Sequence, residues 1–217
     1  MVRHGRHCTD LYFSPLAGSL GARIALYEAG AEVRFIEVDP KTKRTPDGSN
    51  FAAIFPLGLV PLLRLDDGSL LSENAAILQY IANRFPESNL APTDELARAH
   101  LQQWLSFIGT ELHQRLFCVL LDEAAPEGTR THTLMKCESR LAYLTNHLSD
   151  REFLLDHFTV ADAYLYAVLN WSVGARVSLS RYPAIKDYHR RLRTRPSVAR
   201  AYQEEMMLYR ATSHYAA

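Results

Sequence analysis

The pattern of hydrophobic and polar residues changes along the chain. In the first part, four short runs with alternating or continuous apolar residues predict strands: residues 10–14, 32–38, 60–65 and 69–71. Two other runs in this part have helical spacing, residues 21–28 and 73–85. This order predicts a βαβ unit followed by a ββα unit, in which helices cover a small mixed sheet.

Turn residues mark the limits of these elements. Gly30 ends the first predicted helix, and residues 39–50 form a polar loop that contains two prolines. The turn Asp66-Asp67-Gly68 joins two strands as a hairpin. Pro86 stops the second helix, because the residue before a proline disfavours helical geometry.

Every element predicted beyond these units is a helix. One apolar stripe predicts a long helix: Leu101, Leu105, Ile108, Leu112, Leu116 and Leu120. A second stripe predicts another: Leu134, Cys137, Leu141, Leu144 and Leu148. A third helix, residues 161–171, follows Thr159 and Asp162 at capping-box spacing, and two more begin at Pro183 and Pro196. The chain is thus predicted to have four parts: an N-terminal extension at 1–8, an α/β domain at 9–86, a linker at 87–94 and an all-helical (all-α) domain at 95–217.

Composition and charge exclude several classes of function. The 217 residues carry 24 basic and 24 acidic side chains, so no net field attracts nucleic acid or an anionic membrane. No run of about 18 apolar residues can span a bilayer, and the N-terminal residues lack the apolar centre of a signal peptide. The three widely spaced cysteines, Cys8, Cys118 and Cys137, indicate a reducing compartment. We therefore expect a soluble cytoplasmic protein without a metal site, because its histidines show no ligand spacing.

Three features of the first part point to one ligand. Pro61 stands at a strand entrance, and a cis Val60–Pro61 bond would leave the N–H and C=O of Val60 free to pair with an extended peptide. Glu73 and Asn74 stand where a strand runs into a helix, so Glu73 can bind an amine and the free N–H groups a carboxylate. Ser19 stands at a helix start, where a hydroxyl and the dipole can stabilise a thiolate. A ligand with a peptide backbone, an α-amino acid head and a thiol has all three groups.

Longer motifs resemble those of the cytosolic glutathione S-transferases, and the similarity is closest to bacterial beta-class-like members. The motifs are L-Y-F-S-P from Leu11, V-D-P-K-T-K-R-T-P-D-G from Val38, P-L-G-L-V-P-L-L-R-L-D-D-G-S-L-L-S-E-N from Pro56 and F-T-V-A-D-A-Y from Phe158. The resemblance implies a thioredoxin-like N-terminal domain, an all-helical C-terminal domain and a homodimer. Residues 206–217 run past the usual end of the family, either as a cover over the cleft or as a disordered tail.

The resemblance also implies roles for individual residues. The Val60–Pro61 pair would bind the cysteinyl backbone of glutathione through Val60. Glu73 would bind the γ-glutamyl ammonium and Asn74 its carboxylate. Lys43 would approach the peptide, and His113 would reach the cleft from the helical domain.

The first turn of the first predicted helix departs from the beta-class pattern. Gly18 stands where these relatives have a cysteine, and Phe13 where they have a tyrosine. The run from Ser19 to Arg23 instead resembles the S-x-x-x-R pattern of theta-class relatives, whose serine activates the thiol. We therefore expect Ser19 to be the catalytic residue, with Ser14 as second candidate. Disulfide chemistry is not expected, because it needs a cysteine nucleophile in this turn.

Structural interpretations exist for the same residues. Those that can equally be caps, turn residues or solvated charges are Ser19, Pro61, Glu73, Lys43 and His113. Those assigned to folding or to the core alone are Thr159, Asp162, Tyr164, Trp171, Cys118 and Cys137.

The sequence predicts a glutathione transferase that activates bound glutathione as a thiolate near Ser19, for attack on an apolar electrophile held between the domains. One alternative is a non-catalytic relative with a binding or regulatory role, which the replacements at Phe13, Gly18, Leu57 and Leu59 favour. Another is glutathione-dependent peroxide reduction or isomerisation at the same site.

Overall fold

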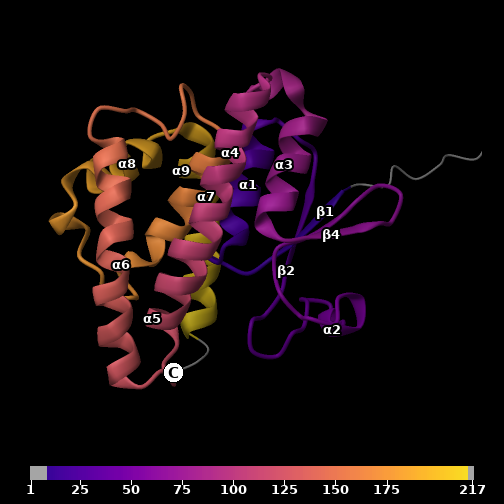
Figure 1. The fold of residues 1–217 in the computed structure, drawn as a ribbon. Helices are drawn as coiled ribbons and strands as arrows, with labels where there is room; N and C mark the ends of the chain where they lie inside the picture. Colours follow the sequence, from indigo (N-terminus) through magenta and orange to yellow (C-terminus); the bar gives the residue numbers. More distant parts are fainter. Residues whose placement is uncertain (1–8, 215–217) are drawn as a thin grey trace, which may run out of the picture.

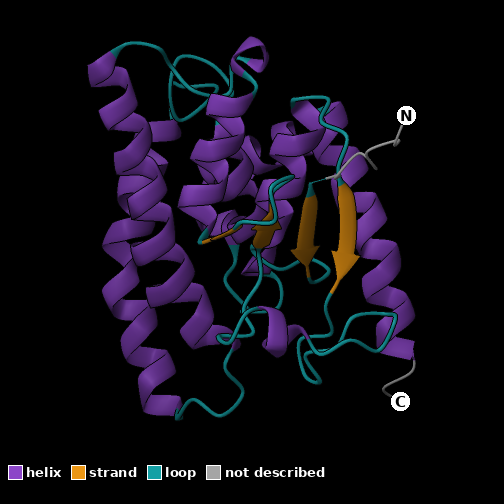
Figure 2. Ribbon diagram, turned by 90° about the vertical axis from the view of Figure 1, so that its right-hand side faces the viewer, coloured by secondary structure: helices purple, strands orange, loops and turns teal. Residues whose placement is uncertain are grey.

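The computed structural model describes residues 9–214, so the predicted extension at 1–8, with Cys8, lies outside the described residues (Figure 1). The first part of the described chain contains a four-stranded sheet with the order β2-β1-β3-β4 (Figure 2). Its strands are β1 (Asp10–Phe13), β2 (Arg34–Glu37), β3 (Leu62–Arg64) and β4 (Leu70–Ser72). β1 runs parallel to β2 and antiparallel to β3, and β3 runs antiparallel to β4. The sheet is therefore mixed, as the order of the elements predicts.

Helices cover both faces of this sheet, and for that reason every residue of β1 is buried. The helices of this part are α1 (Ser19–Glu28), α2 (Phe51–Ile54) and α3 (Asn74–Arg84). Leu11 and Leu63 point to the face that α1 and α3 cover, where they belong to the main hydrophobic core. Tyr12 points to the opposite face, where its ring centroid lies 5.2 Å from that of Phe51 in α2. The alternation of β1 thus fixes which side of the sheet each helix covers.

After α3 the described chain consists of helices and loops (Figure 1). The helices are η1 (Pro86–Ser88), α4 (Glu95–Phe107), η2 (Ile108–Cys118), α5 (Val119–Leu121), α6 (Glu127–Leu148), α7 (Val160–Leu169), η3 (Asn170–Ser172), η4 (Leu179–Arg181), α8 (Pro183–Arg193) and α9 (Pro196–His214). α4, η2 and α5 follow one another without a break, and η2 has π-helical hydrogen bonding. All six residues of the apolar stripe predicted for this long helix are buried.

α7 forms the centre of the helical part, and all ten of its residues are buried. Its capping box, predicted from Thr159 and Asp162, is present. The carboxylate of Asp162 accepts hydrogen bonds from the N–H of Thr159 at 2.8 Å, the N–H of Leu154 at 2.9 Å and the hydroxyl of Tyr188 at 2.7 Å. This one side chain therefore ties α7 to the preceding loop and to α8.

α1 joins the two parts of the molecule, because it packs against α3 of the first part and against α7 and α9 of the helical part. Its first eight residues, from Ser19 to Leu26, are all buried. A helix enclosed in this way holds the turn before it, residues 14–18, between the sheet and the helical part.

The predicted fold class is confirmed: a thioredoxin-like N-terminal domain is followed by a helical C-terminal domain. The boundaries predicted between the parts stay predictions. Two elements differ from the sequence-based expectation. α1 begins at Ser19 rather than at Gly21, and α2 lies in a region without a helical period, because four residues make only one turn.

Within residues 9–214, no helix is both long and apolar enough to cross a membrane. The same residues contain no group of three or more His, Cys, Asp or Glu side chains that could hold a metal ion. Cys118 and Cys137 are free thiols, and burial raises the pKa of both. Cys137 is buried in the core, as expected, whereas Cys118 is partly exposed.

Candidate active site

Three chain segments meet at one edge of the sheet. In its register, Tyr12 of β1 pairs with Leu62 of β3, and Leu62 pairs with Ser72 of β4. The segment after Tyr12, the segment before Leu62 and the segment after Ser72 therefore lie side by side. These segments contain the turn that leads into α1, the Val60–Pro61 pair and the Glu73–Asn74 pair. The sheet thus brings together the three features that the sequence predicted separately.

The Val60–Pro61 peptide bond is cis, as expected. Within residues 9–214, the N–H and C=O of Val60 make no hydrogen bond to another backbone group. Both groups are available to the main chain of an extended ligand, which would add to this edge like a further strand. Lys43 lies beside the same segment, because a Cβ placed on Gly58 would be 3.5 Å from its Cδ atom.

Glu73 stands between β4 and α3 in a conformation that is rare for a residue with a side chain, with φ 69° and ψ 123°. Such a backbone costs about 1–3 kcal/mol, and residues that keep it cluster at ligand sites. The carboxylate of Glu73 is exposed and does not cap its own helix. The first N–H groups of α3 therefore remain open to an anion beside a free carboxylate, which can bind a cation.

Asn74, the first residue of α3, is buried and directs its amide towards the start of α1. A Cβ placed on Gly18 would lie 2.8 Å from Nδ2 of Asn74 and 3.1 Å from Cε1 of His113. Nδ1 of His113 in turn lies 2.7 Å from the hydroxyl oxygen of Tyr164 in α7. Oδ1 of Asn74 is buried and has no hydrogen-bond partner in the described part of the chain. Gly18, Asn74, His113 and Tyr164 therefore form one polar cluster, which we call the Gly18 cluster.

The Gly18 cluster carries no charge at neutral pH. Burial lowers the pKa of His113 to about 4, and burial raises the pKa of Tyr164 far above its usual value. The imidazole and the phenol are thus both neutral around pH 7. The cluster can offer hydrogen bonds at the first turn of α1 without adding a formal charge there.

Ser19 is fully buried at the start of α1. Its Oγ donates a hydrogen bond to the carbonyl of Ser14 at 3.3 Å and accepts one from the N–H of Ser14 at 3.4 Å. The hydroxyl of Ser14 donates to the carbonyl of Val38 at 2.6 Å. Both serine hydroxyls are therefore used within the protein, and Ser19 would have to leave the Ser14 carbonyl to donate to a thiolate.

The helical part of the molecule holds the turn before α1 at Leu16, whose φ is 59°. The N–H of Leu16 donates to a carboxylate oxygen of Glu205 in α9 at 2.7 Å, and its carbonyl accepts from Nε1 of Trp171 at 2.8 Å. Glu205 is fully buried, with Arg23 3.6 Å from its other oxygen. Burial raises the pKa of Glu205 to about 8, although Arg23 acts in the opposite direction. The turn that carries Gly18 is thus positioned from α9 and η3.

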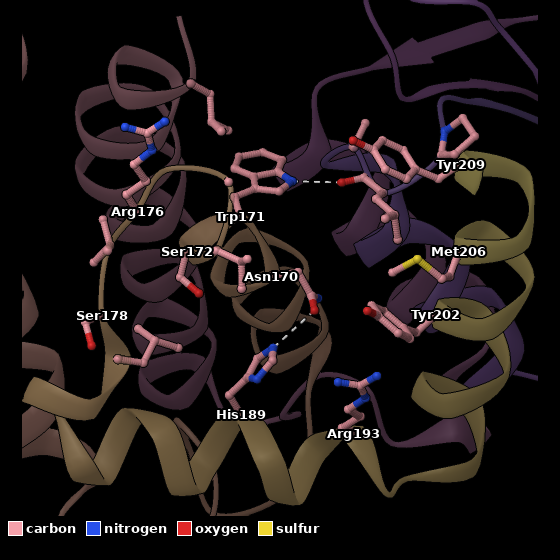
Figure 3. A pocket seen from close by; sticks show the side chains of 18 of the residues that line it. Asn170, Trp171, Ser172, Arg176, Ser178, His189, Arg193, Tyr202, Met206 and Tyr209 are labelled. Atoms are coloured by element: carbon pink, nitrogen blue, oxygen red, sulfur yellow. Dashed lines mark hydrogen bonds between the residues drawn. The ribbon is translucent and has the colours of Figure 1, made fainter. Parts of the chain in front are cut away.

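A cavity of about 980 Å³ adjoins this turn (Figure 3). Its wall consists of residues 14–17, 170–174 and 176–180, of Pro40 and Leu121, and of side chains from α8 and α9. We call it the α9 cavity. Met206 and Tyr209, from the segment beyond the usual end of the family, line the cavity. α9 continues to His214, so a helix, not a disordered tail, forms this segment up to that residue. Residues 215–217 lie outside the described residues.

The sequence predicts that Tyr164 and Trp171 belong to the core, and both pack there, but it gave no sign of their contacts with the candidate site. Tyr164 is buried, but its hydroxyl contacts His113. The ring of Trp171 lies 4.7 Å from that of His113, centroid to centroid, and its N–H holds Leu16. The helical period of α7 can predict that Tyr164 faces inward, but it cannot predict which polar group the hydroxyl meets.

Two family models match the chain: "Glutathione S-transferase, N-terminal domain" over residues 12–83 and "Glutathione S-transferase, C-terminal domain" over residues 128–191. Among known proteins, glutathione S-transferase GstA of Escherichia coli O157:H7 is 36% identical over 197 residues, which cover 90% of this chain and 98% of the relative. These matches extend over both parts of the fold.

Solved structures agree with these matches. A sphingomonad glutathione S-transferase complexed with glutathione superposes with a TM-score of 0.86 at 37% identity, over 90% of this chain and 98% of the other. A bacterial beta-class enzyme from Sphingomonas chungbukensis superposes with a TM-score of 0.85 at 37% identity, with the same coverage. Family models, relatives and architecture therefore lead to one conclusion: the chain belongs to the glutathione S-transferase family, among its bacterial, beta-class-like members.

Proposed function

We propose that this enzyme binds glutathione along the sheet edge, holds it as a thiolate at the start of α1 and transfers it to an apolar electrophile. The observation that carries the proposal is the register of the sheet, which aligns Val60, Glu73 and the first turn of α1. Glutathione has a peptide backbone, an α-amino acid head and a thiol, and each has a complementary group at this edge. The related sphingomonad structure with bound glutathione supports the same ligand.

Each part of glutathione binds to a different group at the sheet edge. The N–H and C=O of Val60 pair with the cysteinyl main chain, and the carboxylate of Glu73 binds the γ-glutamyl ammonium. The amide of Asn74 is directed to Gly18, so we assign the γ-glutamyl carboxylate to the open N–H groups of α3, including that of Asn74. Lys43, whose side chain lies beside Gly58, supplies charge for the remaining carboxylate.

The thiolate needs stabilisation, since lowering a thiol pKa from about 8.5 to about 6.5 corresponds to roughly 2.7 kcal/mol. One hydrogen bond to a charged group contributes about 1.5–3 kcal/mol, and a helix N-terminus about 0.3–1 kcal/mol. We propose Ser19 as the hydroxyl donor after rotation away from Ser14, with the amide of Asn74 and neutral His113 beside it. Any one of these three donors together with the N-terminus of α1 accounts for the required stabilisation without a cysteine.

The acceptor binds in the α9 cavity, because the cavity shares residues 14–17 with the turn that precedes Gly18 and Ser19. Catalysis then consists of bringing thiolate and acceptor together and stabilising the thiolate. The thiol first loses its proton to solvent, and the thiolate sulfur then donates an electron pair to form a new bond to the electrophilic carbon. A leaving group departs with its bonding pair, or, at an activated double bond, the neighbouring carbon takes up the pair and a proton from solvent.

Peroxide reduction and isomerisation are the alternatives at the same site. In the first, the thiolate attacks a peroxide oxygen and releases an alcohol or water, and a second glutathione then displaces the product as a disulfide. In the second, the thiolate adds to the acceptor and leaves again, so that glutathione is released unchanged.

Calorimetric titration with glutathione tests the binding proposal. We expect Glu73→Ala to weaken binding by about tenfold, because a charged hydrogen bond contributes about 1.5–3 kcal/mol. Glu87→Ala, which removes an exposed carboxylate on η1, is the matched control and should bind like the wild type. Absence of binding to the wild type at millimolar glutathione would instead favour a non-catalytic regulatory relative.

The family resemblance further leads us to infer a cytoplasmic homodimer, with no nucleic-acid or membrane partner. Sedimentation velocity at micromolar concentration measures the oligomeric state directly. A monomer under these conditions would contradict this part of the proposal.

A further inference from the structure

We propose that the α9 cavity selects acceptors that carry an anionic group on an aromatic body, a specificity that rests on the transferase function proposed above. The general expectation for this protein was an apolar electrophile. The side chains of the cavity give a narrower answer, because they combine aromatic walls with unpaired positive charge.

The cavity has an aromatic and aliphatic body. Trp171, Tyr202 and Tyr209 line it together with Leu16, Val177 and Met206. In Figure 3 the side chains of Tyr202 and Met206 point from α9 towards the space in front of Trp171. A volume of about 980 Å³ is at the upper end of ordinary ligand pockets, so it accommodates more than a single ring.

The charge of the lining has one sign. Arg176, Lys186 and Arg193 line the cavity, and no aspartate or glutamate among residues 9–214 does so. Such side chains remain cationic across the physiological range of pH. A concave apolar site with charge of one sign attracts a ligand of the opposite sign.

Arg193 is the cation best placed to meet a ligand. It rises from α8 between His189 and Tyr202 (Figure 3), and its guanidinium lies 4.4 Å from the centroid of the Tyr202 ring. Within the described chain it makes no ion pair with a carboxylate. A guanidinium can bind a carboxylate or sulfonate through two parallel hydrogen bonds.

The acids of α8 and α9, the two helices that contribute Arg193 and Tyr202, are engaged elsewhere. Asp187 of α8 pairs with Arg190 at 2.9 Å on the exposed side of that helix. On α9, Glu204 pairs with Arg200 at 3.0 Å, and Glu205 accepts from the N–H of Leu16. The positive charge of Arg193 is therefore left for a ligand.

The position of Arg193 also orients the acceptor. Trp171 stands on the side of the cavity where its N–H holds the carbonyl of Leu16, two residues before Gly18. Arg193 stands across the cavity on α8 (Figure 3). An acceptor with its anion at Arg193 would direct its opposite end towards the turn at the start of α1, where the thiolate is proposed to lie.

Equilibrium binding of two fluorescent probes tests the inference without glutathione. Anilinonaphthalenesulfonate carries a sulfonate, and N-phenylnaphthylamine has the same aromatic body without it. We expect the wild type to bind the sulfonate about tenfold more tightly than the uncharged probe, because one charge-assisted pair contributes about 1.5–3 kcal/mol. In Arg193→Met the two probes should bind with equal affinity, whereas Arg193→Lys should keep part of the preference for the sulfonate probe. Arg190→Met, which removes a cation on the exposed side of α8, should leave the ratio unchanged.

The transfer reaction distinguishes this inference from the proposed function. A chlorodinitrobenzoate and the corresponding chlorodinitrobenzamide both react by forming a carbon–sulfur bond and expelling chloride, while the thiol proton goes to solvent. We expect a kcat/KM ratio that favours the benzoate by about tenfold and falls towards one in Arg193→Met. Equal use of both acceptors by a wild type that binds glutathione would overturn the anion preference alone. Probe selectivity in a protein that binds no glutathione would overturn the acceptor role and the transferase function together.

Discussion

Gly18 and Asn74 occupy adjoining volumes at the first turn of α1. The amide of Asn74 fills the space that a side chain at position 18 would need, since the built Cβ would be only 2.8 Å from Nδ2. The backbone at Gly18 is ordinary, with φ −58°, so the absence of a side chain there reflects space and not backbone conformation. The glycine and the asparagine therefore depend on each other.

Substitution of Gly18 tests this dependence. We expect Gly18→Ala to lower the free energy of unfolding by about 1–2 kcal/mol, because an added methyl group in a filled site forces its neighbours to move. Asn74→Ser shortens the opposing side chain and should restore most of that loss in the double variant, giving a coupling of at least about 1 kcal/mol. Urea unfolding of the wild type, the two single variants and the double variant measures this coupling. Additive effects of the two substitutions would show that the two residues do not share the volume.

At the scale of residues, the sequence predicted where the candidate site residues stand in the fold better than it predicted where their side chains point. Val60 and Glu73 have the free groups that the sequence led us to expect, because turn and strand–helix junctions expose backbone and side chain in a known way. Ser19 and Asn74 begin α1 and α3, but the hydroxyl of Ser19 bonds within its own turn and the amide of Asn74 points to Gly18. The amide of Asn74 lies beside His113 of η2 and Tyr164 of α7, which are distant in sequence, so its direction could not be predicted from the residues around it.

At the scale of elements, α7 depends on one buried carboxylate. Asp162 is fully buried and accepts from the N–H of Thr159 at the start of α7, the N–H of Leu154 in the preceding loop and the hydroxyl of Tyr188 in α8. Burial raises its pKa, and the hydrogen bonds act in the opposite direction. Loss of this side chain would leave donors buried without partners, which is more costly than loss of an exposed cap.

We therefore expect Asp162→Ala to lower the free energy of unfolding by about 2–4 kcal/mol. The matched control is Asp187→Ala, which removes an exposed pair with Arg190 and should cost less than about 0.5 kcal/mol. Chemical unfolding followed by circular dichroism measures both. Similar small effects for the two variants would contradict the role given to the buried carboxylate.

The elements themselves were largely predictable. The four strands, α1 and α3, and the stripe that runs from α4 through η2 to α5 follow the period of their apolar residues. The π-helical bonding of η2 was not predictable, because its apolar positions recur at the same spacing as those of the α-helix before it. α2 was missed because a single turn, capped by Asn50, leaves no period to read.

At the scale of the molecule, buried titratable groups make folding depend on pH. Burial lowers the pKa of His113 and of His189 from 6.5 to about 4, so between these values the unfolded state binds more protons and stability falls as the pH falls. Glu205 acts in the opposite direction, because its pKa rises from 4.5 to about 8. Its contribution is present below pH 4.5 and is lost as the pH rises towards 8. Between pH 4.5 and 6.5 the two ranges overlap, and the two histidines outweigh the one glutamate, so stability rises with pH up to about 6.5 and falls above it.

We expect the free energy of unfolding to reach its maximum at about pH 6.5 and to decline towards pH 8. Glu205→Gln keeps an oxygen that can accept from the N–H of Leu16 but cannot ionise, so the decline above pH 6.5 should be smaller. Glu127→Gln, an exposed residue of α6, is the control and should follow the wild type. An unchanged decline in Glu205→Gln would show that other groups cause it.

The central claim is that the enzyme holds glutathione as a thiolate at the start of α1. Ultraviolet absorbance of the thiolate, followed against pH at saturating protein, measures this directly. We predict an apparent pKa of about 6.5 for bound glutathione, two units below the ~8.5 of a free thiol, and a higher value in Ser19→Ala. If the pKa of bound glutathione is unchanged in Ser19→Ala, the thiolate is stabilised by Asn74 and the N-terminus of α1 and not by Ser19. A pKa near 8.5 for glutathione bound to the wild type would contradict the account.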